Sequence, residues 1–264
     1  MLKPELKISG FWRTLNLEKR VCMVLLYIDR VLIPAAVVPA LILLFKIYEA
    51  DRQEKEPSRL LWSLVLNGIL ATAIAIVLER LGLWLLGSAV PQNSLTYRIV
   101  EYFVIVALAE EGGKYYLLNR RTWYDPNFNF TFDGVVYAAF VSLGFALWEN
   151  ISYVMMYGLD VAVLRAVTAI PGHACLGVFM GAFYGAAKKY EGLCQQGKCR
   201  LYRCLALICP ALLHGCYDFT ASMESQSSGW IFMAYIAVLF TAAFLLVKRL
   251  SQNDQPIPGS VYFG

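Results

Sequence analysis

The sequence predicts an all-α protein, a polytopic membrane helix bundle of about seven or eight transmembrane helices. Two observations support this prediction. Of the 264 residues, 59% are hydrophobic and only 16% are charged, whereas a soluble domain has roughly 25% charged residues. The apolar residues also gather into long segments, and about 20 such residues cross roughly 30 Å of hydrocarbon as a helix. This composition leaves too little polar surface for a soluble globule, and it excludes disorder and nucleic-acid binding.

Seven apolar segments are long enough to span a bilayer. They lie at about 31–48, 60–86, 95–118, 132–157, 162–187, 201–220 and 229–248. An eighth segment, 17–30, is ambiguous because it contains Asp29 and Arg30, so it could be an interfacial helix or half of a re-entrant hairpin. No repeat or linker divides the chain, and residues 1–264 are therefore expected to form a single integral membrane domain.

Lysine and arginine alternate between the loops, which predicts an orientation in a cell membrane. The loops 49–59, 119–130 and 188–200 are basic, and so is the end of the last span. Because basic loops stay inside, the C-terminus is expected in the cytoplasm. The basic N-terminus does not fit a single crossing at 31–48: either this end violates the rule, or residues 17–48 turn back.

Ionisable residues occur inside four of these apolar segments. Each ionisable side chain in hydrocarbon costs several kcal/mol, so each is a functional hypothesis. Both histidines of the chain belong to this group. Its members are Glu110, Glu111 and Lys114 in one segment, Glu149 in the next, where the polar Asn150 follows it, then His173, and finally His214 and Asp218.

Helical spacing brings these residues together in pairs and at similar depths. Glu110 and Lys114 are four residues apart, as are His214 and Asp218, so each pair shares a helix face. With a rise of 1.5 Å per residue, the acids and histidines lie about 9 to 22 Å from the outer ends of their spans. We therefore expect a water-filled cavity nearer the outer face of the membrane.

This set of residues predicts peptide hydrolysis by an activated water. Two histidines with one or two carboxylates suit zinc with an open position for water, while a further glutamate acts as general base. The paired glutamates also allow a metal-free mechanism, in which one protonated and one ionised carboxyl activate water. The sequence leaves both open, and the two histidines favour a divalent metal, with zinc preferred. The predicted catalytic residues are Glu110, Glu111, His173 and His214, and the predicted metal ligands are His173, His214, Glu149 and Asp218.

Four motifs follow one another on successive predicted spans within residues 100–220. They are Glu-Glu-x-x-Lys at 110–114, the run from Asp133-Gly134 through Gly144-Phe145 to Glu149-Asn150, the span of His173, and His-x-x-x-Asp at 214–218. This order resembles the PrsW-type intramembrane proteases, which are related to CAAX-processing and bacteriocin-immunity membrane proteases.

The resemblance implies that the paired glutamates and the intramembrane histidines form the active site. It also implies a bacterial protein whose substrates are single-pass or membrane-anchored proteins of the anti-sigma-factor type. The CAAX-type relatives have Phe-x-x-x-His where this chain has Phe145-x-x-x-Glu149, so their metal chemistry does not transfer unchanged.

Other interpretations of the same residues stay open. An ion or small-solute transporter also places acids and histidines on facing helices, but transporters commonly show internal repeats and this chain shows none. The polar residues could instead form a network that only fixes helix packing. Glu79, Arg80 and Arg165 are interpreted as interfacial or snorkelling residues, and Pro171 is expected to free backbone carbonyls near the site.

Overall fold

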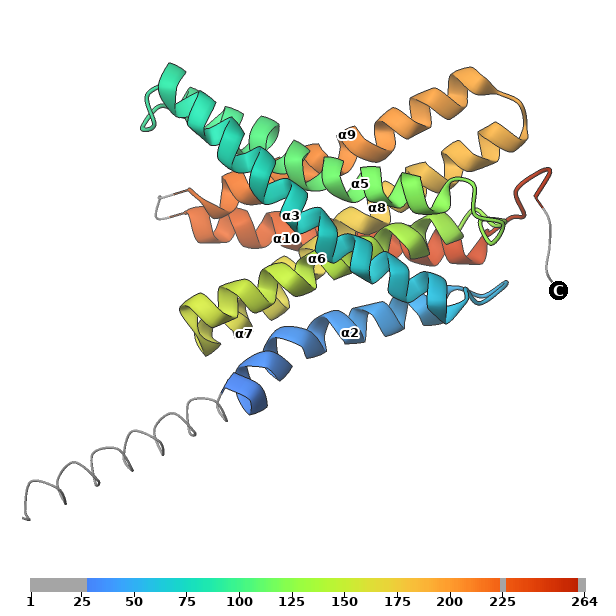
Figure 1. Ribbon diagram of the computed structural model, residues 1–264, viewed down its shortest axis with the longest axis horizontal. Helices are drawn as coiled ribbons and strands as arrows, with labels where there is room; N and C mark the ends of the chain where they lie inside the picture. The colour runs from blue at the N-terminus through green and yellow to red at the C-terminus, as the bar shows by residue number, and fades with distance from the viewer. Residues whose placement is uncertain (1–27, 224–226, 261–264) are drawn as a thin grey trace, which may run out of the picture.

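The computed structural model describes residues 28–223 and 227–260 and shows a bundle of helices (Figure 1). Across these residues there is no β-strand, only an isolated bridge between Phe130 and Pro256. The elements are η1 (Ile28–Leu32), α2 (Ile33–Ala50), α3 (Ser58–Ala89), α4 (Leu95–Ile99), η2 (Val100–Val106), α5 (Ala107–Thr122), α6 (Asp133–Tyr157), α7 (Leu159–Val167), α8 (Ala169–Gly192), α9 (Gln196–Ala221) and α10 (Ser228–Gln252), where η marks a π-helix.

The predicted all-α polytopic membrane bundle is confirmed. Six helical segments are long and apolar enough to cross a membrane: Arg30–Ala50, Ser58–Ala89, Asp133–Tyr157, Leu159–Gly192, Gln196–Ala221 and Ser228–Gln252. The consecutive elements α4, η2 and α5 form a further long segment of the bundle, at the position of the predicted span 95–118.

Two predicted segments differ from the structure or lie partly outside its description. The predicted span 162–187 is longer, from Leu159 to Gly192, and Thr168 divides it into α7 and α8. Of the ambiguous segment 17–30, only residues 28–30 are described. Residues 28–50 form one helical run that does not turn back. The alternative that residues 17–48 turn back stays a prediction, because residues 17–27 lie outside the described part of the chain.

The loops that the sequence marks as basic meet at one end of the bundle. Figure 1 shows the loops 51–57, 123–132 and 193–195 on the right, together with the end of α10. We call this the basic end. The segment 90–94 and the junction between α6 and α7 lie at the opposite end.

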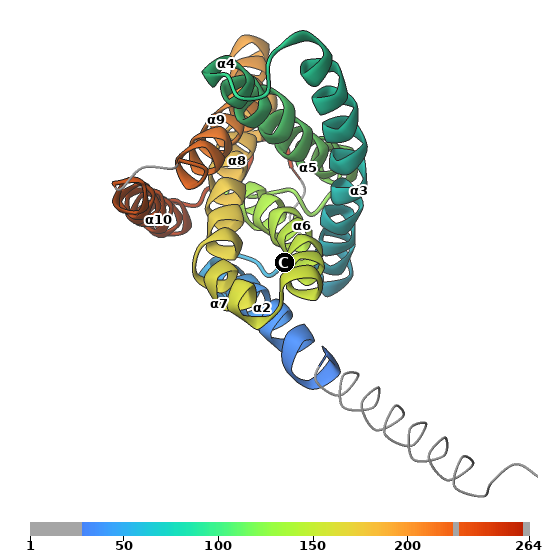
Figure 2. The same ribbon diagram turned by 90° about the vertical axis from the view of Figure 1, so that its left-hand side faces the viewer.

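Helices α6 and α8 lie in the middle of the bundle, with α3 and α5 on one side and α10 on the other (Figure 2). Close approach of the central helices depends on glycine. A Cβ atom on Gly181 would overlap the backbone of Gly134 and Val135 on α6, and one on Gly144 would overlap the backbone of Val65 on α3. The helix that carries His173 therefore packs closely against α6 inside the bundle.

Local sequence explains several helix ends. The hydroxyl of Ser94 accepts a hydrogen bond of 3.1 Å from the backbone N–H of Tyr97 and so caps α4. Gly158, with φ of 88°, ends α6 in a conformation that favours glycine. Pro171 lies in the first turn of α8, where the N–H groups have no partner within the helix. It therefore disrupts no hydrogen bond within α8, and the expectation of freed carbonyls stays a prediction.

The glycine contact between α6 and α8 can be tested by adding a single methyl group. We expect Gly181→Ala to lower the melting temperature by roughly 3–10 °C, since overpacking a tight interface costs about 1–3 kcal/mol. Gly197→Ala is the matched control, because a Cβ there meets no atom within 4 Å. Thermal unfolding of both variants in detergent is the measurement, and equal melting temperatures would contradict the close contact.

Candidate active site

A buried lysine ties together the two glutamates of α5. Lys114 and Glu111 are completely buried, and Glu110 is 8% exposed. The Nζ atom of Lys114 lies 2.8 Å from Oε1 of Glu111 and 3.2 Å from Oε2 of Glu110. Buried charges are tolerated only with such partners, and the predicted pairing of Glu110 with Lys114 is confirmed.

The same lysine reaches α8 and α6. Its Nζ lies 3.2 Å from Nδ1 of His173 and 3.9 Å from the centre of the Phe145 ring. An ammonium group can only donate hydrogen bonds, so Nδ1 of His173 accepts and Nε2 carries a proton. That Nε2 donates to Oε2 of Glu149 over 2.8 Å, and both nitrogens of His173 are thereby occupied.

His214 connects α9 to the glutamate pair. Its Nδ1 lies 2.9 Å from Oε1 of Glu111, and its Nε2 lies 3.4 Å from Oδ2 of Asp218 and 3.8 Å from Oε2 of Glu110. The predicted pairing of His214 with Asp218 is thus present. The rings of His173 and His214 are nearly perpendicular, with centroids 5.5 Å apart.

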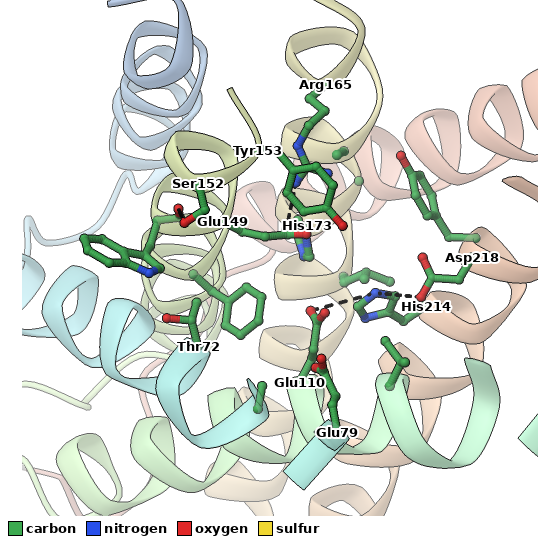
Figure 3. A pocket seen from close by; sticks show the side chains of 18 of the residues that line it. Thr72, Glu79, Glu110, Glu149, Ser152, Tyr153, Arg165, His173, His214 and Asp218 are labelled. Carbon is green, nitrogen blue, oxygen red and sulfur yellow. Dashed lines mark hydrogen bonds and ion pairs between the residues drawn. The ribbon is translucent and has the colours of Figure 1, made fainter. Parts of the chain in front are cut away.

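Most of these side chains border a cavity of about 400 Å³ (Figure 3). Glu110 faces this cavity, whereas Glu111 is fully buried and is not part of its wall. Glu149 is eight residues from the end of α6 at Tyr157, about 12 Å along the helix axis. The wall of the cavity includes Thr72, Glu79, Glu110, Tyr153, Glu149, Arg165, His173, His214 and Asp218.

Two charged residues of the cavity were not predicted as part of the site. Arg165 forms an ion pair of 2.9 Å with Glu149, and its Nε donates to Oδ1 of Asn150 over 3.0 Å. Glu79 lies ten residues before the end of α3 at Ala89, so it is not at a span end. The apolar run that continues beyond Arg80 is the sequence signal that could have placed Glu79 inside the span.

Three donor residues lie close enough to hold one metal ion. Ligand atoms of Glu110, Glu111 and His214 all lie within 4.8 Å of one another, and Oε2 of Glu111 is buried without a hydrogen-bond partner. Carboxylate oxygen and imidazole nitrogen are ligands that zinc accepts. The ion pairs around these three donors involve four carboxylates and two basic side chains, so the group has a formal negative charge. The carboxylates are those of Glu110, Glu111, Glu149 and Asp218, and the basic side chains are Lys114 and Arg165.

The predicted catalytic and ligand residues are all found at this site, in a grouping that the sequence did not specify. His173 pairs with Glu149 and Lys114 and is not part of the three-donor group. Asp218 contacts Nε2 of His214, whereas Glu111 contacts Nδ1. The ligand set of His173, His214, Glu149 and Asp218 stays a prediction.

The chain resembles known proteins over most of its length. Residues 56–247 match the model of the family described as PrsW family intramembrane metalloprotease. A protein named Protease PrsW from Clostridioides difficile (strain 630) is 33% identical over 233 residues, which cover 87% of this chain and 93% of that protein. Protease PrsW of Bacillus subtilis (strain 168) is 32% identical over 222 residues, covering 82% of this chain and 93% of the relative.

A third relative, Protease PrsW of Geobacillus kaustophilus (strain HTA426), is 30% identical over 225 residues, with 85% of this chain and 94% of the relative covered. No solved structure matches the chain. The family match spans the segments that carry the cavity, from α3 to α9. The chain is a multi-pass membrane protein with bacterial relatives, and it belongs to the PrsW family of intramembrane metalloproteases.

Proposed function

We propose that this protease hydrolyses peptide bonds of membrane-anchored protein substrates in the cavity between α3, α5, α6, α8 and α9. The observation that carries the proposal is the convergence of Glu110, His173 and His214 from three helices on one polar cavity within a membrane bundle. A polar network that only fixed packing would have no need of a cavity large enough for a peptide group. The family assignment favours a peptidase over a transporter.

The residues of the site fit a divalent metal ion. Glu111 and His214 would hold it, with Glu110 beside them, since ligand atoms of the three residues lie within 4.8 Å of one another and one buried oxygen of Glu111 lacks a partner. When bound, such an ion acts as a Lewis acid and lowers the pKa of a water molecule. Zinc is the ion that this mixture of oxygen and nitrogen ligands favours.

Glu110 is the side chain best placed to take a proton from the attacking water. It is the member of the glutamate pair that faces the cavity, while Glu111 is held behind it by Lys114 and His214. General-base catalysis requires a carboxylate within hydrogen-bonding reach of the water. In a metal-free version the same carboxylate activates water, and the histidines orient it or stabilise the oxyanion.

Glu149 has a positioning role in this scheme. Its Oε2 receives both the Nε2 proton of His173 and the guanidinium of Arg165. A carboxylate held by two donors is a weak base, and it is better suited to fix His173 and to keep the Arg165 guanidinium at the wall of the cavity. That guanidinium can stabilise negative charge on the carbonyl oxygen of the substrate.

The substrates are proposed to be single-pass or membrane-anchored proteins, with anti-sigma-factor regulators as the class that the family resemblance favours. The cavity lies toward the end of the bundle opposite the basic end. If the basic end faces the cytoplasm, cleavage takes place near the outer face of the membrane.

The role of Glu110 predicts a specific loss of activity. We expect Glu110→Gln to lower the rate of cleavage of a membrane substrate by about 100- to 10,000-fold, because the amide cannot accept the proton. Glu49→Gln is the matched control, since Glu49 is paired only with Lys46 on the surface. Rates are measured on folded protein in liposomes, and a wild-type rate for Glu110→Gln would exclude it as the base.

The ligand assignment predicts which variants lose metal. Protein purified without added metal is expected to contain about one equivalent of a transition metal, since protein zinc sites bind tightly. Glu111→Gln and His214→Ala should lose it, whereas His173→Ala should keep it. Elemental analysis measures this. Loss of metal in His173→Ala would favour the ligand set predicted from sequence. Less than about a tenth of an equivalent in wild type, with full activity in chelator, would favour the metal-free version.

The orientation is tested by reporter fusion to residue 264. A reporter that is active only in the cytoplasm should be active, and one that is active only outside should be silent, because α10 ends at the basic end. The reverse result would place the cavity near the cytoplasmic face.

A further inference from the structure

A second cluster of buried acids lies at the basic end, away from the active site. Asp51 and Glu56 belong to the loop between α2 and α3, and Asp133 begins α6. Their exposed fractions are 1%, 4% and 1%. Asp133 is 16 residues from Glu149 along α6, about 24 Å of helix, so the two clusters are separate.

The carboxylates of this cluster have too few partners. Both oxygens of Asp51 and Oε2 of Glu56 are buried without a hydrogen-bond partner. Asp133 is partly satisfied, since its Oδ2 accepts hydrogen bonds from the backbone N–H groups of Asn129 and Phe130, at 3.0 and 2.7 Å. A buried carboxylate without a partner costs several kcal/mol.

Basic side chains near the cluster do not neutralise it. In the part of the chain that the structure describes, none of the three acids forms an ion pair. The ammonium of the neighbouring Lys55 instead donates to the backbone carbonyls of Tyr48 and Asp51. Burial raises the pKa of Asp51 to about 6, against a lowering effect of Lys55, and burial raises the pKa of Glu56 to about 8; neighbouring acids add to both increases.

The geometry of the cluster matches a coordination sphere of oxygen ligands. Ligand atoms of Asp51, Glu56 and Asp133 lie within 4.8 Å of one another, and oxygens around Ca²⁺ at 2.3–2.6 Å can be up to about 5 Å apart. All three donors are carboxylates, which suit the hard ions Ca²⁺ and Mg²⁺ rather than zinc. We propose that Asp51, Glu56 and Asp133 bind a hard divalent cation, Ca²⁺ or Mg²⁺, that fastens the loop 51–57 to the start of α6.

The cation would also stabilise the packing of two further segments at the basic end. Asp254, which follows α10, accepts hydrogen bonds from Thr131 Oγ1 at 2.9 Å and from the backbone N–H of Phe132 at 2.8 Å, and its Oδ2 is a further buried oxygen without a partner. Asp254 acts electrostatically on both Asp51 and Asp133. A divalent ion in the cluster therefore reduces the repulsion among four carboxylates that join α2, α6 and the segment after α10.

The test uses the purified full-length protein, stripped with chelator and titrated with Ca²⁺ or Mg²⁺ alone in a calorimeter. We expect saturable binding of about one equivalent of one of these ions. Binding should raise the melting temperature by about 5 °C or more at saturation. Asp51→Asn and Glu56→Gln should abolish binding and the thermal shift, whereas the surface control Glu49→Gln should retain both.

The cation-free state supplies a second measurement. In chelator, Asp51→Asn should melt at or above the wild-type temperature, because removing one charge relieves the repulsion that the cation otherwise offsets. The double variant Glu111→Gln, His214→Ala should bind Ca²⁺ or Mg²⁺ as the wild type does, which separates this site from the active site.

Two results would overturn the proposal. One is no saturable binding of either ion to the wild-type protein, in which case the acids share protons. The other is binding that survives Asp51→Asn and Glu56→Gln but is lost in the active-site double variant.

Discussion

The compensation of one fully buried ammonium group governs the arrangement of the active site. Lys114 has no access to water, and an ion of this size loses several kcal/mol of hydration on burial even after the protein relaxes. It regains this energy only if Glu110, Glu111 and His173 all remain within about 3 Å of its nitrogen. Two of these partners are on its own helix, and the third is on α8. Charge compensation thus fixes the relative position of α5 and α8, and it orients His173 so that its second nitrogen meets Glu149.

Such short polar contacts between helices require that the backbones approach closely. Lipid supplies no hydrophobic force between helices, so packing and hydrogen bonds must hold the bundle together. Gly134, Gly144 and Gly181 permit this approach at the two faces of α6. Because α6 also carries Phe145 under the Lys114 ammonium, a displacement of α6 would weaken both the packing and the charge cluster. The glycine contacts and the buried charges therefore depend on each other.

Features set by local helix geometry were predictable from the sequence, and features set by helix rotation were not. The pairs Glu110 with Lys114 and His214 with Asp218 follow from a spacing of four residues, which depends only on the helical repeat. The division of the glutamates, with Glu110 at the cavity and Glu111 behind it, depends on how α5 is rotated against α9, and a single sequence contains no such information. Arg165 was missed for a related reason: a long side chain near a helix end can reach water or turn inward, and only its contact with Glu149 shows which.

The two acidic clusters differ in the source of their compensating charge. At the cavity, lysine and arginine already neutralise part of the negative charge. At the basic end, Asp51 and Glu56 have no such partner among the described residues, and their burial leaves a cation or protons as the compensation. Because α6 begins with Asp133 in one cluster and presents Glu149 to the other, its position is constrained at both ends. A helix held in this way gives the cavity a rigid wall, which is what the positioning of a water molecule for peptide hydrolysis requires.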